Sequence, residues 1–175
     1  MAFAVSAWFD AALESRVRAI WTLLSESDLS SAFHEGPYRP HITLTVCEEL
    51  DRSAFSGALR QAIGNSRPLP VILPSLGIFN NDPPAMFLGV TVSRDLLDLH
   101  AVVHRLSTAY GRGPRAYFLP GRWNPHCTLA PAIAPTELAR AMVLLSEMKL
   151  PLVGSIERLG IIDTPAEVEL EAIDF

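Results

Sequence analysis

The sequence predicts an α+β fold of two lobes, with two antiparallel-rich sheets flanking a central cleft and helices on the outside. Short apolar runs alternate with segments of helical periodicity, and the order strand, helix, strand, helix, strand occurs twice. The pentapeptide Pro-His-Ile-Thr-Leu at 40–44 also has a second copy, Pro-His-Cys-Thr-Leu, at 125–129. We therefore expect residues 1–175 to form a single two-lobed domain with an internal repeat of roughly 1–83 and 84–175.

The first half contains two segments of helical periodicity, each preceded by a side chain that can cap a helix. Asp10 precedes the first, in which apolar residues recur at helical spacing from Leu13 to Leu24, and Asp51 precedes the second. Pro70 and Pro74 interrupt a later strand-like run, which predicts an edge strand or a bulge. The elements expected here are a strand at 3–9, a helix from Ala11, a loop at 25–38, the motif strand at 41–47, a helix from Asp51 to Gly64, a strand at 69–79 and a turn at 80–84.

The second half is expected to follow the same order. Asp95 is expected to begin the third helix and Thr136 to cap the fourth. A loop rich in Gly, Pro, Arg and aromatic residues leads into the second motif strand. The elements expected here are a strand at 86–92, a helix from Asp95, a loop at 111–124, the motif strand from His126, a helix after Thr136, and strands at 150–162 and 168–175 around a turn at 163–165.

Local matches between the halves support the duplication. Leu-Gly-Ile-Phe at 76–79 matches Leu-Gly-Ile-Ile at 159–162, and Pro-Ala at 84–85 matches Pro-Ala at 165–166. A duplicated unit that cannot bury its sheet alone pairs with its twin, here around a pseudo-two-fold axis. That symmetry would place the two motif strands on opposite walls of one cleft. The remaining matches are Phe3 with Phe87 and His41 with His126.

The repeated motif has the residues needed for acid–base chemistry on a phosphate. Alternating residues of a strand share a face, so each copy directs a His and a Thr to one side. Two imidazoles can serve as base and acid near neutral pH, and hydroxyls can donate to the non-bridging oxygens of a phosphate. The candidate catalytic residues are therefore His41, Thr43, His126 and Thr128, and the side chains expected behind them are Ile42, Leu44, Val46, Cys127 and Leu129.

The two His-x-Thr-Leu motifs, half a chain apart, resemble those of the 2H phosphoesterase superfamily, which includes bacterial proteins called 2′-5′ RNA ligases. The resemblance implies metal-independent hydrolysis, without a cofactor, of a 2′,3′-cyclic phosphate on a nucleotide or RNA end. It assigns His41 and His126 as the acid–base pair and Thr43 and Thr128 as phosphate ligands. The alternatives are 2′-5′ RNA phosphodiesterase or ligase activity, and a catalytically silent module that binds a nucleotide or RNA end. Ala-Pro-Ala-Ile at 130–133 lacks the basic residue that often follows the second motif in ligase-like members.

Substrate contacts are expected from the residues that precede each motif. The stretch 111–123 has three arginines, several aromatic residues and no acidic residue, and it leads directly into the second motif. Arginine pairs with phosphate, and aromatic rings stack on bases. The alternative is an ordinary loop with Trp123 packed into the core. The candidate substrate-binding residues are Arg115, Tyr117 and Trp123 in this stretch, and Tyr38 and Arg39 before the first motif.

The other histidines and cysteines are expected to have structural roles. His100 and His104 are one helical turn apart without a third ligand, which favours a surface or half-buried pair over a metal site. Cys47 is expected on the catalytic face of its strand but lacks an activating neighbour, so burial is expected. Cys127 is expected on the face opposite its histidine, which disfavours a disulfide between the two cysteines.

Composition limits the class of protein further. A net charge of −5 over 175 residues disfavours non-specific binding of long nucleic acid but allows a small anionic substrate. The N-terminus lacks the pattern of a signal peptide, and no apolar run approaches the roughly 20 residues of a membrane helix. We expect a cytoplasmic protein with no membrane association and no obligate protein partner.

Overall fold

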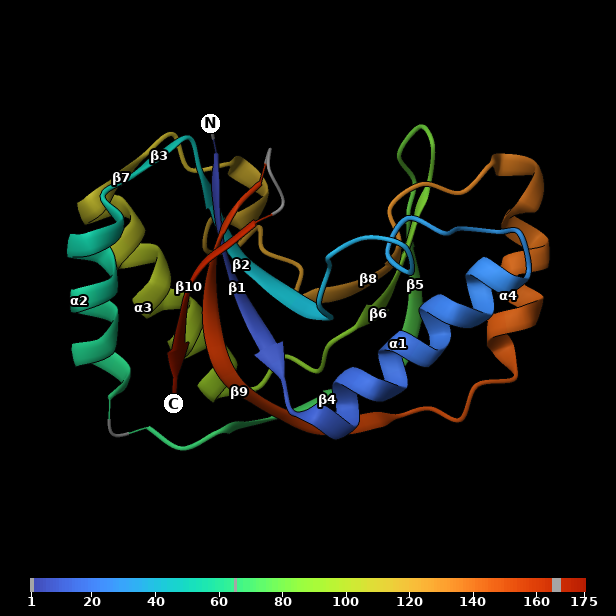
Figure 1. Ribbon diagram of the computed structural model, residues 1–175, viewed down its shortest axis with the longest axis horizontal. Coiled ribbons are helices and arrows are strands. Elements are labelled where there is room, and N and C mark those ends of the chain that lie inside the picture. Colours follow the sequence, from blue (N-terminus) through green and yellow to red (C-terminus); the bar gives the residue numbers. More distant parts are fainter. Residues whose placement is uncertain (1, 65, 165–167) are drawn as a thin grey trace.

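The computed structural model describes residues 2–64, 66–164 and 168–175 and has the predicted α+β architecture (Figure 1). Two sheets form the two lobes, and the strand pairs in both are antiparallel. The larger sheet has the order β10 (Val168–Asp174), β9 (Leu152–Asp163), β1 (Phe3–Phe9) and β2 (His41–Cys47), with β4 (Leu69–Leu73) also paired to β9. The smaller sheet has the order β5 (Ser75–Phe79), β6 (Ala85–Gly89) and β8 (His126–Ala130).

The helices lie outside the sheets, two with each lobe (Figure 1). Helices α2 (Arg52–Ile63) and α3 (Arg94–Tyr110) pack on each other beside β2. Helix α1 (Ala11–Glu26) packs against β9 and β1 as well as β8, and α4 (Leu138–Ser146) lies on the side of the smaller sheet. Each lobe therefore contains elements from both halves of the chain: β9, β10 and α3 join β1 and β2, while α1 and β5 join β6 and β8. The lobes are interleaved along the sequence.

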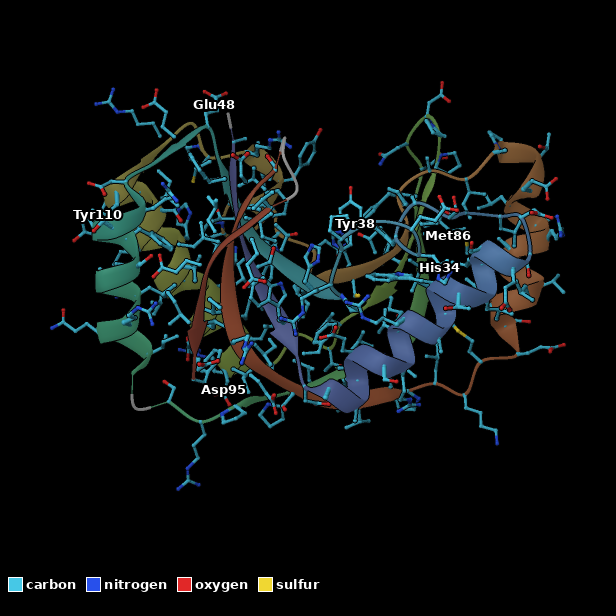
Figure 2. All side chains as sticks on the ribbon, in the orientation of Figure 1. His34, Tyr38, Glu48, Met86, Asp95 and Tyr110 are labelled. Carbon is cyan, nitrogen blue, oxygen red and sulfur yellow. The ribbon has the colours of Figure 1, made fainter. Side chains whose placement is uncertain are left out.

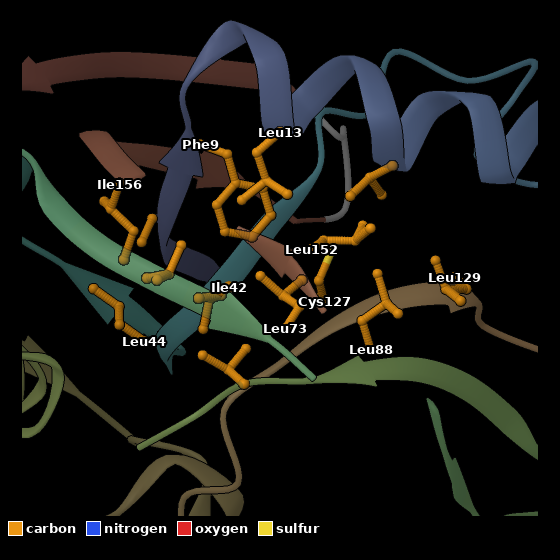
Figure 3. Close-up of a cluster of buried hydrophobic side chains, with 14 of the residues drawn as sticks. Phe9, Leu13, Ile42, Leu44, Leu73, Leu88, Cys127, Leu129, Leu152 and Ile156 are labelled. Carbon is orange, nitrogen blue, oxygen red and sulfur yellow. The ribbon is translucent and has the colours of Figure 1, made fainter. Parts of the chain in front are cut away.

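One hydrophobic core extends under both lobes (Figure 3). Ile42 and Leu44 enter it from β2, and Cys127 and Leu129 enter it from β8, each with an exposed fraction of 1% or less. Leu13 of α1 belongs to the same cluster. The two motif strands consequently share one core and present their polar residues on the other side.

Several elements occur where the sequence predicts them. Strands β1 and β2 have the predicted bounds, and the Asp10 carboxylate accepts a hydrogen bond from the Leu13 backbone N–H (2.8 Å) at the start of α1. Asp51 caps α2 in the same way, accepting from the Ala54 N–H at 3.1 Å. Side-chain caps of this kind satisfy backbone donors that a helix leaves unpaired, so their positions are readable from sequence.

Other boundaries differ from the prediction. Helix α3 begins at Arg94, because the Ser93 hydroxyl, rather than a residue nearer Asp95, accepts from the Leu96 N–H. Thr136 does not cap α4, since it lies within a 3-10 turn, Pro135–Glu137, that precedes the helix. The strand expected at 86–92 ends at Gly89, after which the chain leaves the ladder.

The strand expected at 69–79 divides at Pro74 into β4 and β5, which belong to different sheets and each have a single partner strand. The predicted edge position is therefore confirmed, but the prediction of one continuous strand over 69–79 is wrong. The loop at 111–124 contains β7 (Gly111–Arg112), which pairs with β3 (Glu49–Leu50), and a 3-10 turn at Ala116–Phe118. Pro165 and Ala166, matched above with residues 84 and 85, lie outside the described residues.

Each motif strand contains a β-bulge directly after its threonine. The pairing of β2 with β1 passes over Leu44, and the pairing of β8 with β6 passes over Leu129. A bulge places two residues opposite one and changes the direction of the side chains that follow. The Leu that ends each His-x-Thr-Leu motif is thus the extra residue of a bulge.

The bulge in β2 overturns two predicted side-chain directions. Val46 lines the pocket beside Thr43 instead of facing the core. Cys47 is 1% exposed and does not line that pocket, because its side chain faces Ser107 of α3. Burial raises the pKa of the Cys47 thiol. Strict alternation, which predicted the opposite faces, fails at the inserted residue.

Gly160 of β9 lies beneath the indole of Trp8, where a Cβ atom would overlap the ring. We expect Gly160→Ala to lower the free energy of unfolding by about 1–3 kcal/mol, because the buried indole would have to move. Gly57→Ala is the matched control: Gly57 lies in α2 with open space around it, so alanine should stabilise the helix by about 0.5–1 kcal/mol. Urea titrations measure the free energy of unfolding of both variants, and an equal change in the two would contradict the packing of Trp8 on Gly160.

Candidate active site

The motif histidines use the same ring nitrogen for the same kind of contact. His41 Nδ1 lies 2.7 Å from the carbonyl oxygen of Arg39, and His126 Nδ1 lies 2.7 Å from that of Asn124. Because a carbonyl oxygen only accepts, Nδ1 is the protonated nitrogen in each neutral ring. Each Nε2 therefore has a lone pair available to a substrate, and both rings have the same tautomer.

The environment lowers the pKa of both imidazoles below the ordinary value of histidine. Burial is the main cause at His41, the Arg39 carbonyl opposes it, and the nearby His126 lowers the pKa further. Burial also outweighs the Asn124 carbonyl at His126. Since a charge on one ring disfavours a charge on the other, the pair favours a state with no more than one added proton.

Two tryptophans hold the backbone of the motif threonines. The Trp123 Nε1–H donates to the carbonyl oxygen of Thr43 (2.9 Å), and the Trp21 Nε1–H donates to that of Thr128 (3.2 Å). Trp21 comes from α1 and Trp123 from the loop before β8, so each threonine is held by a residue from the other half of the chain. The Trp123 contact links the segment before β8 to the backbone of β2, and the Trp21 contact links α1 to the backbone of β8.

His100 supports one of these tryptophans from behind. Its ring stacks on Trp123 with centroids 4.0 Å apart and planes at 5°, and its Nε2 donates to the Phe118 carbonyl oxygen at 2.9 Å. His100 is 3% exposed, so the predicted surface or half-buried position is wrong for this residue. The packing of α3 onto β2, which no local pattern reveals, buries the ring.

Two pockets flank the histidine pair and meet at Phe118. The first, called here the His41 pocket, has a volume of about 230 Å³ and is lined by Ala4, Ser6, Trp8, Pro37, Tyr38, Arg39, His41, Thr43, Val46, Phe118, Ile162, Thr164 and Glu169. The second, the His126 pocket, has a volume of about 520 Å³ and is lined by Phe79, Asn81, Tyr117, Phe118, Arg122, Trp123, Asn124 and His126. Both open beside a motif histidine, and Figure 2 shows Tyr38 between the two lobes.

The two pockets are built from residues at matching positions. Tyr38 and Trp123 each stand three residues before the motif histidine, and Arg39 and Asn124 each stand two before it. The matching positions nevertheless differ in charge, because Arg39 is cationic and Asn124 is neutral. Each pocket has one arginine in its lining, Arg39 or Arg122, and the His41 pocket also has Glu169. The site is pseudo-symmetric in backbone and asymmetric in what it offers a ligand.

Arg39 is fixed between a carboxylate and an aromatic ring. Its guanidinium donates to Glu14 of α1, with Nη2 2.7 Å from Oε2, and lies 4.9 Å from the Trp8 ring centroid. Burial alone would raise the pKa of Glu14, but its bonds to Arg39 and Arg18 hold that pKa below the usual range. These contacts fix the guanidinium beside His41, where the Glu14 carboxylate offsets part of its positive charge.

A model of the 2′-5′ RNA ligase superfamily matches residues 9–167. The chain belongs to this superfamily. No curated protein matches the chain significantly in sequence.

Solved structures with the same fold cover nearly the whole chain. TT0787 of Thermus thermophilus is 19% identical, with a TM-score of 0.61 and coverage of 99% of this chain and 97% of that one. Escherichia coli LigT, in a complex with 3′-AMP, is 13% identical with a TM-score of 0.60 and the same coverage. Kluyveromyces marxianus Usb1 is 16% identical with a TM-score of 0.51, covering 98% and 95% of the two chains. At such low sequence identities, the structural similarity shows that these proteins share the fold and shows no more than that.

The structure places most of the residues predicted for this superfamily member around the pair of pockets. Tyr38 and Arg39 line the His41 pocket with Thr43, whereas Tyr117 and Trp123 line the His126 pocket. Arg115 is exposed and lines neither pocket. Thr128 is half-buried at the matching position of β8 and also lines neither.

Sequence reasoning missed several residues that line the pockets. Ser6 and Trp8 line the His41 pocket, because β1 pairs with β2 and turns alternate residues toward it. The alternation within 3–9 predicts that these residues share a face, but the partner strand is not readable from sequence. Arg122, four residues before His126, lines the other pocket.

Within residues 2–64, 66–164 and 168–175, which the structure describes, no group of three or more His, Cys, Asp or Glu side chains is arranged to hold a metal ion. None of the helices in these ranges combines the length and the apolar character needed to cross a bilayer.

The indole contacts to the threonine carbonyls can be tested in matched variants. Trp123→Phe and Trp21→Phe each remove one N–H donor while keeping an aromatic ring, so each should lower the free energy of unfolding by about 1 kcal/mol. The double variant should lose more than either single one, as measured by urea titration. Unchanged stability in both single variants would show that the indole N–H groups do not hold the strands.

Proposed function

We propose that this superfamily member hydrolyses the 2′,3′-cyclic phosphate of a nucleotide or RNA end, with His41 and His126 as the acid–base pair. The observation that supports this most directly is that both rings bind a carbonyl through Nδ1 and leave Nε2 for a substrate. One phosphodiester reaction needs one base and one acid, and two equivalent imidazoles can supply both. Hydrolysis by this route requires no metal and no cofactor.

In the proposed reaction, a water oxygen attacks phosphorus while the Nε2 of one imidazole takes the water proton. The bond from phosphorus to one ribose oxygen breaks, and the second imidazole, protonated at Nε2, gives its proton to that oxygen. The hydroxyls of Thr43 and Thr128 donate to the non-bridging oxygens as their negative charge grows. One water is consumed, a terminal phosphate monoester forms, and exchange with solvent restores both rings.

The proposed ligand class suits the two arginines of the pockets and agrees with the structural neighbours. Arg39 beside one histidine and Arg122 near the other suit a phosphorylated ligand. LigT has been crystallised with 3′-AMP, a nucleotide with a terminal phosphate. The aromatic walls formed by Tyr38, Phe118 and Tyr117 suit a nucleobase.

A second candidate function is cleavage or ligation of a 2′-5′ phosphodiester linkage in RNA. The family model that matches this chain is described as the 2′-5′ RNA ligase superfamily, which makes this activity a candidate. The same pair of imidazoles would serve, because attack by a hydroxyl instead of water differs only in the nucleophile. Short 2′-5′-linked RNAs and RNAs with a cyclic-phosphate end distinguish the two activities.

Replacing either histidine should abolish most turnover without unfolding the protein. His41→Asn and His126→Asn retain an amide donor near the Nδ1 position but lack Nε2, so kcat should fall by about 10²–10⁴-fold with the melting temperature nearly unchanged. His34→Ala, in an exposed loop, is the matched control and should retain activity. The assay uses EDTA-treated protein with 2′,3′-cyclic nucleotides and the RNAs named above.

The outcomes of this assay separate the alternatives. Loss of wild-type activity after EDTA treatment would contradict the two-histidine mechanism. Unfolding of either Asn variant would indicate a mainly structural histidine. Binding of cyclic nucleotides without turnover of any substrate would instead favour a catalytically silent module that binds a nucleotide or RNA end.

The lowered pKa values predict an acidic optimum for the free enzyme. Catalysis needs one imidazole protonated and one neutral, and both groups titrate below the ordinary value near 6.5. The proportion of imidazolium therefore decreases as pH rises through the lowered pKa, and kcat/KM should be greatest below pH of about 6.5. A bound phosphate stabilises the imidazolium and so raises the pKa of the histidine, and the pH optimum of kcat should therefore lie above that of kcat/KM. A kcat/KM maximum well above neutrality would contradict the assigned environment.

A further inference from the structure

The two motif strands have different neighbours beside their threonines. Ser6 of β1 lies directly opposite Thr43, whereas Phe87 of β6 lies directly opposite Thr128. Directly opposed residues of neighbouring strands share a face of the sheet and lie close together. The His41 pocket thus has a second hydroxyl next to Thr43, where the matching position of the other lobe has an aromatic ring.

The Ser6 side chain is buried and has no structural partner. Its exposed fraction is 0%, and its Oγ has no hydrogen-bond partner among the residues that the structure describes. Ser6 nevertheless lines the His41 pocket with His41 and Thr43. A buried hydroxyl without a partner destabilises a folded protein, so its presence in a ligand pocket points to a partner supplied by the ligand.

A second unpaired donor lines the same pocket. Trp8 is 1% exposed, lies directly opposite His41, and its Nε1–H has no acceptor within the described part of the chain. Ser6 and Trp8 are two residues apart on β1, and both line the His41 pocket. Two buried donors without acceptors suit a ligand that brings several acceptor oxygens, as a phosphate does.

We propose that the Ser6 hydroxyl binds a non-bridging phosphate oxygen of the substrate, next to the hydroxyl of Thr43. This inference rests on the proposed function, since it names a further contact to the phosphate at the same site. The Ser6 O–H donates to the oxygen, and the negative charge that grows there in the transition state strengthens the bond. Because Phe87 occupies the matching position opposite Thr128, the His126 side has an aromatic ring there instead of a hydroxyl.

Ser6→Ala tests the proposal, because it removes the hydroxyl and leaves the backbone and nearly all of the packing. For a 2′,3′-cyclic nucleotide, kcat should fall by about 10- to 100-fold with a smaller change in KM. The melting temperature should stay the same or rise, since an unpaired buried hydroxyl is lost. Ser6→Thr, which keeps the hydroxyl, should retain most of the activity.

The matched control is Thr45→Val. Thr45 is 1% exposed, its hydroxyl faces the Cys47 thiol, and it does not line the His41 pocket. This variant should match Ser6→Ala in stability and the wild type in activity. Equal loss of activity in both variants would show that any buried hydroxyl at this sheet affects the site indirectly, and would overturn the proposal.

The remaining outcomes separate this proposal from the proposed function. Wild-type kcat/KM in Ser6→Ala, with active wild-type protein, overturns the Ser6 contact alone. If the wild type turns over no substrate, the proposed function fails, and calorimetric titration with inorganic phosphate tests the contact. Weaker phosphate binding by Ser6→Ala than by Thr45→Val then supports it, whereas equal dissociation constants overturn it.

Discussion

Burial of Ile42 and Leu44 together with Cys127 and Leu129 in one hydrophobic core sets the relative position of the two motif strands. These side chains alternate with the catalytic candidates along each strand, so the packing that stabilises the fold also turns the histidines to the opposite face, where the two pockets lie. Close-packed cores tolerate little displacement, and truncation of a buried leucine typically costs about 2–5 kcal/mol. The geometry of the site is therefore maintained from the side that no ligand reaches.

The two halves of the site are alike in the groups proposed for proton transfer and different in the groups that would bind a ligand. The proposed proton transfer depends on the Nδ1–carbonyl contacts, which are the same at His41 and His126. Ligand binding depends on the surrounding side chains, which differ: Arg39 beside one ring corresponds to Asn124 beside the other. A substrate that is itself asymmetric, such as a nucleotide, would meet an equal pair of proton-transfer groups and unequal walls.

The sequence predicted what depends on local pattern and missed what depends on strand partners. The strand 41–47 and the cap Asp10 were predicted because periodicity and capping chemistry act over a few residues. The bulge at Leu44 was missed, since it exists only relative to β1, and it reversed the predicted direction of Cys47. The burial of His100 was missed for the same reason, because the packing of α3 onto β2 creates it.

The interleaving of the lobes also determines the order in which the protein can be completed during synthesis. Strand β1 is synthesised before both of its neighbours, and one of them is β9, which ends only at Asp163. A nascent chain that already contains both motifs still leaves one edge of β1 unpaired, exposing backbone groups to other chains. Contacts between distant parts of a chain also form slowly, because long loops must close first. Assembly of the larger sheet therefore waits until β9 has been synthesised.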